Sequence, residues 1–268
     1  MLRIWSWNVN GRHLWDRLDA NEVDVALLQE APAPFGPWEG KVIPHPATGW
    51  GTAGSSNWLR TAVVAVSETT RLEPRPLTSL EERASESLLV SRRGTLAAAD
   101  VVVDGERITL VSMYAVWEGR SGLIYADASA HRLLSDLSRI VTDARSHRII
   151  AAGDLNILHR YGDYGDSYWA ARYATVFDRA EAMGLRFVGP QAPCGKQANP
   201  WPAELPEDSL SVPTYHTLKQ GPIGATRQLD FVFASHALAD RLSVRALNTN
   251  TDEWGPSDHC RVVIELHS

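Results

Sequence analysis

The chain has 268 residues, of which 44% are hydrophobic, enough to bury the core of one large domain. Acidic residues number 32 against 26 Lys and Arg, so the formal net charge is −6 at pH 7. This charge excludes a positive field over the whole surface that would attract nucleic acid. It leaves open an enzyme whose positive charge is confined to a cleft.

Cysteine usage and hydropathy further restrict the class of protein to which this chain can belong. Cys194 and Cys260 are far apart, which excludes a disulfide framework and a structural zinc site. The first residues are typical of a strand and lack the basic and then apolar segments of a signal peptide. No apolar run approaches the roughly 18 residues that a membrane span needs. We therefore expect a soluble, cytoplasmic monomer with no membrane partner, folded as a single domain over residues 1–268.

Short runs rich in Val, Ile, Leu and Ala predict strands, and several of these runs end in a polar residue. In chain order they are residues 2–7, 23–28, 61–66, 96–103, 107–113, 148–152, 229–234, 242–247 and 260–266. Because the runs are nearly continuously apolar, both faces of these strands should be covered.

Helices are predicted at three places. Residues 13–20 predict a short helix, and residues 124–145 carry apolar side chains at three- and four-residue spacing, which gives one buried stripe. Residues 172–183 predict a further helix that ends at Gly184.

Two segments predict long loops. Residues 191–212 are rich in proline, and residues 159–173 are rich in Tyr and Trp. Aromatic side chains in the second loop can stack on unpaired bases, or they can pack the following helix against the core. Both interpretations stay open at this point.

Polar residues follow the first two predicted strands. Asn8 comes after the strand at residues 2–7, and Glu30 follows the strand at residues 23–28. Amide and carboxylate oxygens at strand ends are suitable ligands for hard cations such as Mg2+ and Mn2+. Taken singly, Asn8 is also typical of a turn before Gly11, and Glu30 of an ordinary surface carboxylate.

A stronger signal follows the buried strand at residues 148–152. Gly153 lets the backbone turn where Asp154 emerges, and Asn156 stands two positions later. If the chain stays extended, Asp154 and Asn156 point to one side. The alternative is a helix cap or an Asx turn.

Two further acids are associated with His259. Asp258 precedes it directly, and an adjacent Asp and His can supply a metal ligand and a group that transfers a proton or contacts a phosphate. Asp230 lies within an apolar run, where an unpaired carboxylate is costly. It needs a partner, for which His259 is the candidate; a purely structural His259 is the alternative.

Five segments, taken in order, resemble the motif series of one family. They are SWNVNG at residues 6–11, LQE at 28–30, GDLN at 153–156, QLDFVFAS at 228–235 and SDH at 257–259. The series is similar to that of the endonuclease/exonuclease/phosphatase family, which includes exonuclease III-type nucleases, DNase I, sphingomyelinases, inositol-polyphosphate 5-phosphatases and deadenylases. The resemblance extends over residues 1–266 and implies an α/β fold, a four-layer α/β sandwich with two facing mixed β-sheets flanked by helices.

The resemblance also implies roles for single residues. Asn8 and Glu30, joined by Asp258, look like ligands of Mg2+ or Mn2+, and Asp154 looks like the residue that orients or deprotonates the attacking water. Asn156 would hold that water or a phosphoryl oxygen, and Asp230 would pair with His259. His259 and Tyr114 would contact the phosphate. The residues expected to bind the substrate are Asn10, Arg12 and His216.

These inferences predict a divalent-metal-dependent phosphoesterase in which an activated water attacks phosphorus in line. The first hypothesis for the substrate is DNA or RNA, cleaved by a nuclease or nucleotide phosphodiesterase. The second is a small phosphorylated metabolite, which the net charge of −6 favours. A catalytically silent binding module is a third hypothesis, but the presence of Glu30, Asp154 and His259 disfavours it.

Overall fold

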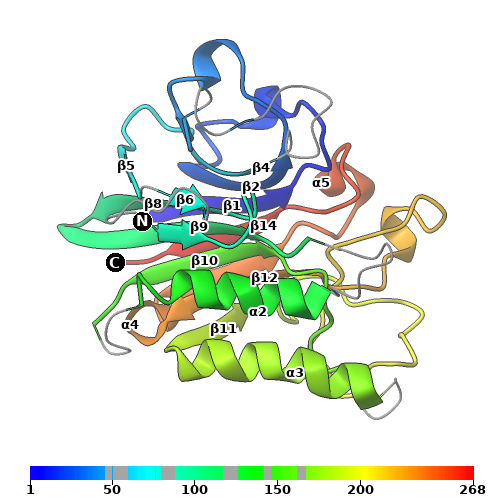
Figure 1. Cartoon of the computed structure of the whole chain (residues 1–268). Helices are drawn as coiled ribbons and strands as arrows, with labels where there is room; N and C mark the ends of the chain where they lie inside the picture. Colours follow the sequence, from blue (N-terminus) through cyan, green and yellow to red (C-terminus); the bar gives the residue numbers. More distant parts are fainter. Residues whose placement is uncertain are drawn as a thin grey trace.

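Two six-stranded sheets lie face to face (Figure 1) in the computed structural model, which describes residues 1–45, 50, 60–75, 77–79, 88–116, 126–141, 146–161 and 167–268. Sheet A has the order β13 (Leu242–Ala246), β14 (Val262–Leu266), β1 (Leu2–Asn8), β2 (Val25–Ala31), β4 (Arg60–Ala65) and β3 (Val42–Ile43). Sheet B has the order β11 (Leu185–Gly189), β12 (Asp230–Ser235), β10 (Ile149–Asp154), β9 (Glu106–Tyr114), β8 (Leu96–Val103) and β5 (Leu72–Pro74). A small separate sheet pairs β6 (Leu77–Ser79) with β7 (Leu88–Val90).

Both large sheets are mixed. In sheet A β1 runs parallel to β2, and in sheet B β9 runs parallel to β10, whereas the other neighbouring strands are antiparallel. The carboxyl ends of two parallel strands lie at the same edge of a sheet. Asn8 and Glu30 in sheet A, and Tyr114 and Asp154 in sheet B, are therefore brought to strand ends.

Apolar side chains fill the space between the sheets. Ile4 and Leu27 of sheet A meet Ile108 and Ile150 of sheet B in one buried cluster. This double-sided burial is the reason why the strand sequences are nearly continuous in hydrophobicity rather than alternating.

The outer faces of the sheets are covered differently. Helices α2 (Ala126–Leu137) and α3 (Ser167–Ala182) lie against sheet B (Figure 1), where Leu133 and Val176 join Phe231 in a second cluster. Sheet A is covered, within the described residues, by loops and the one-turn helices η1 (Trp15–Arg17) and η2 (Gly36–Trp38). The other short helices are η3 (Pro222–Gly224), α4 (His236–Ala239) and α5 (Thr251–Trp254). No helix among the described residues has the length and apolar character needed to cross a membrane.

The predicted fold class is confirmed, and each of the nine predicted strands has a counterpart in the two sheets. The helix predicted at residues 13–20 is wrong, because only the one-turn η1 forms there. The side chain of Asp19 accepts a hydrogen bond from the backbone N–H of Asn21, an Asx turn that competes with further helix.

The other predicted helices shift their bounds. Of the helix predicted at residues 124–145, the structure has α2 over Ala126–Leu137, and residues 138–141 are not helical. Residues 124–125 and 142–145 lie outside the described residues. Helix α3 begins before residue 172 and takes in the end of the predicted loop at residues 159–173, of which residues 162–166 are not described. The i, i+4 contact of Trp169 with Tyr173, at 5.9 Å between ring centroids, supports this extra turn. Strands β3, β5, β6, β7 and β11 were not predicted; all of these except β11 have only two or three residues, too few to give a periodic signal.

A buried polar contact joins the two sheets close to the strand ends. Gln29 of β2 donates from Nε2 to Oγ of Ser112 in β9 at 3.0 Å, and Ser112 donates to the carbonyl of Leu28 at 2.7 Å. Both side chains are fully buried. The bonds therefore fix the separation of the sheets where the polar strand ends meet.

Gly153 is required by close backbone packing. It has φ 154°, and a Cβ atom at this position would lie 1.9 Å from the carbonyl oxygen of Met113 on β9. No side chain can be accommodated without separating β9 from β10.

Replacing Gly153 by Ala should lower the free energy of unfolding by at least about 3 kcal/mol, because the clash is with backbone rather than with a flexible side chain. The measurement is urea-induced unfolding, with Gly40→Ala as the control, since a Cβ at Gly40 meets nothing within 4 Å. Equal midpoints for the two variants would refute the steric argument.

Candidate active site

The amide of Asn8 lies between two carboxylates from different sheets. Its Nδ2 donates to Oε1 of Glu30 at 2.9 Å and to Oδ2 of Asp154 at 3.0 Å. Its Oδ1 accepts from the backbone N–H of Asn10 at 2.9 Å, which orients the amide. Asn8 and Asp154 are both buried, and the hydrogen bonds to charged acceptors offset part of the cost of desolvating them.

Glu30 reaches this position through a local irregularity of β2. The pairing of β2 with β4 shifts register between Leu28 and Ala31, and Glu30 itself has φ 48°. The hydroxyl of Tyr114 is hydrogen-bonded to Glu30. Burial, together with the charges of Glu30 and Asp154, raises the pKa of Tyr114 far above its ordinary value, so the phenol stays a donor.

Asp154 is held by its own loop as well. The backbone N–H of Asn156 donates to Oδ1 of Asp154 at 2.8 Å, and Nδ2 of Asn156 donates to Oδ2 at 3.2 Å and to the carbonyl of Ala115 at 3.0 Å. Asn156 has φ 51°, the left-handed conformation that Asn tolerates. The sequence left open whether Asp154 forms an Asx turn or points to the same side as Asn156. Both features are present.

His259 pairs with Asp230 and faces Asp154. Its Nδ1 lies 2.8 Å from Oδ2 of Asp230, and its Nε2 lies 3.8 Å from Oδ2 of Asp154. The expected Asp230–His259 pair is therefore present, and all three side chains are buried.

Backbone contacts fix the segment that carries His259. Nε1 of Trp7 donates to the carbonyl of His259 at 3.0 Å, and Oγ of Ser257 donates to the carbonyl of Asn8 at 2.7 Å. Both bonds tie the loop before β14 to the end of β1. The position of His259 is thus set by the same strand that carries Asn8.

Buried charges change the protonation of this cluster. Burial raises the pKa of the Asp154 carboxyl, against the lowering effect of His259, and the nearby charges of Asp230 and Glu30 raise it further. For His259, burial lowers the pKa, but the carboxylates of Asp230 and Asp154 outweigh burial and raise it well above its ordinary value. A protonated His259 therefore balances part of the negative charge.

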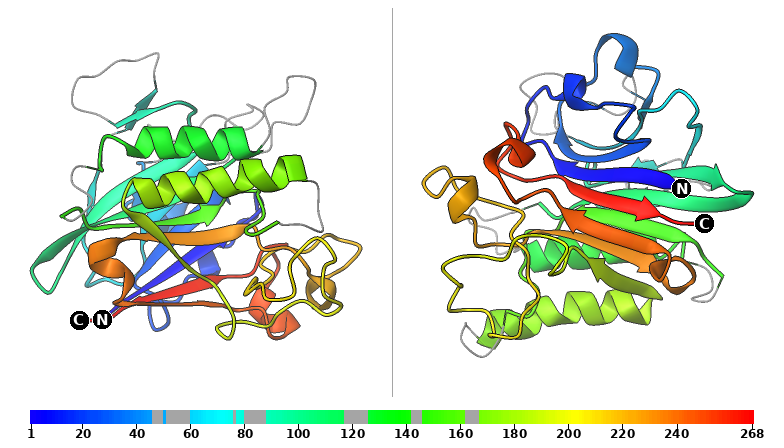
Figure 2. Two further views of the ribbon diagram at one scale, coloured as in Figure 1. Left: turned by 90° about the horizontal axis from the view of Figure 1, so that it is seen from below. Right: turned by 180° about the vertical axis from the view of Figure 1, so that it is seen from behind.

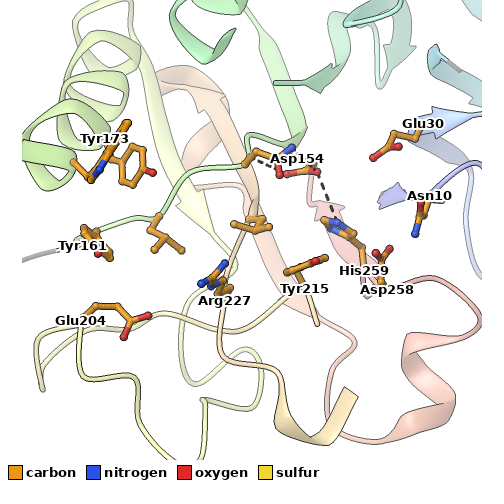
Figure 3. A pocket seen from close by; sticks show the side chains of 14 residues that line it. Asn10, Glu30, Asp154, Tyr161, Tyr173, Glu204, Tyr215, Arg227, Asp258 and His259 are labelled. Carbon is orange, nitrogen blue, oxygen red and sulfur yellow. Dashed lines mark hydrogen bonds and ion pairs between the residues drawn. The ribbon is translucent and has the colours of Figure 1, made fainter. Parts of the chain in front are cut away.

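These groups line a cavity of about 500 Å³ (Figure 3). Asn10, Glu30 and Asp258 lie on one side of the Asp154–His259 contact, and Arg227 and Tyr173 lie on the other. A second hollow of about 700 Å³ adjoins it and shares Asn10, Tyr215 and Asp258 with it. The loops that form the two hollows gather at the end of the sandwich away from the termini (Figure 2).

The residues expected from the sequence fall into three groups. Those lining the cavity are Asn10, Glu30, Asp154, Asn156, Asp258 and His259. Those behind it, bonded to the lining residues, are Asn8, Asp230 and Tyr114. Arg12 and His216 line only the second hollow, and His216 packs its ring on Trp254 at 5.1 Å. The roles of all these residues stay predictions.

Several residues of the site were not expected. The ring of Tyr215 lies 5.0 Å from that of His259, and Arg227 and Glu204 also line the cavity. Thr214 accepts hydrogen bonds at Oγ1 from the backbone N–H groups of Leu229 and Asp230, at 3.0 and 3.1 Å. Tyr215 forms isolated β-bridges to Arg227 and His259, whereas the sequence had pointed to its neighbour His216.

The oxygen donors fit a hard divalent cation. Within the described residues no three Asp, Glu, His or Cys side chains form a ready cage. Mg2+, however, usually binds one or two carboxylates and completes its shell with water and substrate phosphate. Glu30 and Asp258 lie on the same side of the cavity and can serve in this way. Asn8 presents its nitrogen to Glu30, so here it orients a candidate ligand.

Comparison with known proteins is consistent with this site. The family model described as Endonuclease/Exonuclease/phosphatase family matches residues 5–259. No curated protein matches the sequence. The fold is similar to the catalytic domain of APE2 from Xenopus laevis, with a TM-score of 0.65 and 15% identity over 99% of this chain and 91% of that one.

Two further solved structures share the fold. The AP endonuclease LMAP from Leishmania major has a TM-score of 0.62 and 17% identity, with 100% of this chain and 88% of that chain covered. The 3′ phosphatase NExo from Neisseria, bound to a product DNA hairpin, has a TM-score of 0.54 and 17% identity, with 100% of both chains covered. At 15–17% sequence identity, these similarities show a shared fold and nothing more.

Replacing Asn8 by Ala should lower the free energy of unfolding by about 2–4 kcal/mol, because it leaves the buried Asp154 and its neighbour Glu30 without their shared donor. The measurement is urea unfolding in EDTA. Asn21→Ala is the control, since Asn21 is exposed and its side chain donates locally to Asp19. A loss no larger than that of the control would contradict the bridging role.

Replacing Asp230 by Asn should reduce turnover by about 10²–10⁴-fold with little change in melting temperature. The amide keeps an acceptor for His259 but removes the charge that holds the imidazole protonated. Turnover and thermal unfolding are measured together, with Asp240→Asn at an exposed ion pair as the control. A large fall in melting temperature with intact turnover per folded molecule would show that the pair is structural.

Proposed function

We propose that this chain, which belongs to the Endonuclease/Exonuclease/phosphatase family, hydrolyses phosphodiester bonds of DNA or RNA with Mg2+ or Mn2+ as cofactor. The observation that carries the proposal is the meeting of Glu30, Asp154 and the Asp230–His259 pair around one cavity. Because these side chains come from both ends of the sequence, we propose that residues 1–268 act as one catalytic domain.

In the proposed reaction Asp154 accepts a proton from the attacking water. Asn156 and Asn8 hold the Asp154 carboxylate in one orientation by hydrogen bonds. Protonated His259, kept charged by Asp230, donates a hydrogen bond to a phosphoryl oxygen and stabilises the negative charge that develops there. Glu30 and Asp258 would hold the cation, which would supply positive charge to offset that of the phosphate and of the departing oxygen.

Two observations favour nucleic acid as the substrate. The cavity adjoins a second hollow with which it shares lining residues, so a polymer has room to extend beyond the reacting phosphate. Among structures with this fold, LMAP is an AP endonuclease and NExo was solved with a product DNA hairpin. The net charge of −6 favours the second candidate, a small phosphorylated metabolite.

The substrate class is tested with bis-p-nitrophenyl phosphate and p-nitrophenyl phosphate, followed by single- and double-stranded DNA, RNA and sugar phosphates. We expect diester turnover with Mg2+ or Mn2+ that EDTA abolishes. Asp154→Asn should lower this turnover by about 10²–10⁴-fold. It should leave the melting temperature equal or higher, because burial disfavours the charge of Asp154. Turnover of monoesters alone, or an active Asp154→Asn protein, would refute the assignment.

A further inference from the structure

Arg227 is a cation that lines the cavity and has no side-chain partner among the described residues. It is the one Lys or Arg among the described residues that line this cavity. Its guanidinium makes no hydrogen bond or ion pair with any part of the chain that the structure describes. Some other exposed arginines are held in ion pairs, for example Arg160 with Asp208 and Arg186 with Asp240, and these pairs lie outside this cavity. An unpaired guanidinium facing a cavity is suited to an anion, which it binds through a planar fork.

The backbone of Arg227 is held rigidly relative to His259. Tyr215 forms a β-bridge to each of them, and the backbone N–H groups of Thr214 and Tyr215 donate to the carbonyl of Arg227 at 2.9 and 3.0 Å. Two strand spacings therefore separate the Cα atoms of Arg227 and His259, roughly 10 Å. The next residue, Gln228, is anchored from Nε2 to the carbonyl of Pro190 at 2.8 Å.

An aromatic and apolar wall adjoins Arg227. Tyr161 and Tyr173 lie edge to face at 5.9 Å between ring centroids, and Leu158 and Leu229 line the same part of the cavity. Tyr173 and Arg227 both line this cavity. In Figure 3 Arg227 lies between Glu204 and Tyr215, on the opposite side of His259 from Glu30 and Asn10.

We propose that Arg227 binds a second phosphate of the substrate, next to the phosphate that is cleaved, while the intervening nucleoside lies in the cavity against Tyr161 and Tyr173. The preferred substrate is then a nucleotide unit that carries phosphate at both ends, as in an oligonucleotide, rather than a simple monophosphate. This inference rests on the proposed function, because it takes the phosphate at His259 to be the reacting one. Arg227 acts here as a specificity-determining residue.

The test compares a thymidine dinucleotide without terminal phosphate to the same dinucleotide with phosphate on its 5′ or its 3′ end. For one phosphorylated form we expect the parent protein to have a KM about 10- to 100-fold lower, as a charge-assisted contact provides. Arg227→Gln should abolish this preference by raising the KM for the phosphorylated dinucleotide to that for the unphosphorylated one. Arg227→Lys should restore part of the preference, and Arg186→Gln, at an ion pair remote from the cavity, should keep all of it.

Binding without turnover separates this inference from the proposed function. Calorimetry on the Asp154→Asn protein, with and without Arg227→Gln, measures affinity for thymidine 3′,5′-bisphosphate and for the two thymidine monophosphates. We expect Arg227→Gln to weaken bisphosphate binding about 10-fold or more and to change binding of at least one monophosphate much less. No hydrolysis of any diester by the parent protein would refute the proposed function. The role of Arg227 would be overturned if Arg227→Gln weakened activity and binding equally for all substrates and ligands. It would also be overturned if the parent protein did not prefer either phosphorylated dinucleotide.

Discussion

The amide nitrogen of Asn8 joins the two halves of the site. It lies within 3.0 Å of a carboxylate from each sheet, Glu30 from sheet A and Asp154 from sheet B. The separation of these groups therefore depends on how the sheets pack, which the apolar core and the Gln29–Ser112 contact determine. The geometry of the site at the strand ends therefore depends on the packing of the whole sandwich rather than on any one loop.

Negative charge is concentrated in this region, and each carboxylate has a donor. Asn8 and Tyr114 donate hydrogen bonds to Glu30, and Asn156 donates to Asp154. His259 pairs with Asp230. Oδ1 of Asp230 alone lacks a hydrogen-bond partner among the buried oxygens of these groups in the described structure. Such a cluster is unfavourable in isolation and persists because the surrounding strands fix its members. A bound cation or phosphate adds charge next to these carboxylates. Binding is therefore coupled to the protonation of the side chains in the site.

Much of this could be predicted from the sequence, because strands and motifs leave local signals. The five polar segments identified the family, and the cost of burying Asp230 predicted its pairing with His259. Arg227 gave no such signal, since its place across Tyr215 from His259 arises from single bridges between segments distant in sequence. The helix at residues 13–20 was wrong because the Asx turn at Asp19 outweighs a weak apolar pattern.

The direction of β1 has a practical consequence. The strand begins beside the carboxyl-terminal strand, where Leu2 pairs with Leu266, and it ends at Asn8 in the site. Six residues of extended chain span roughly 20 Å, and Figure 2 places both termini at the end of the sandwich remote from the loops around the cavity. A surface tether, fluorophore or fused partner attached at either terminus would thus leave the mouth of the cavity open to a long polymer.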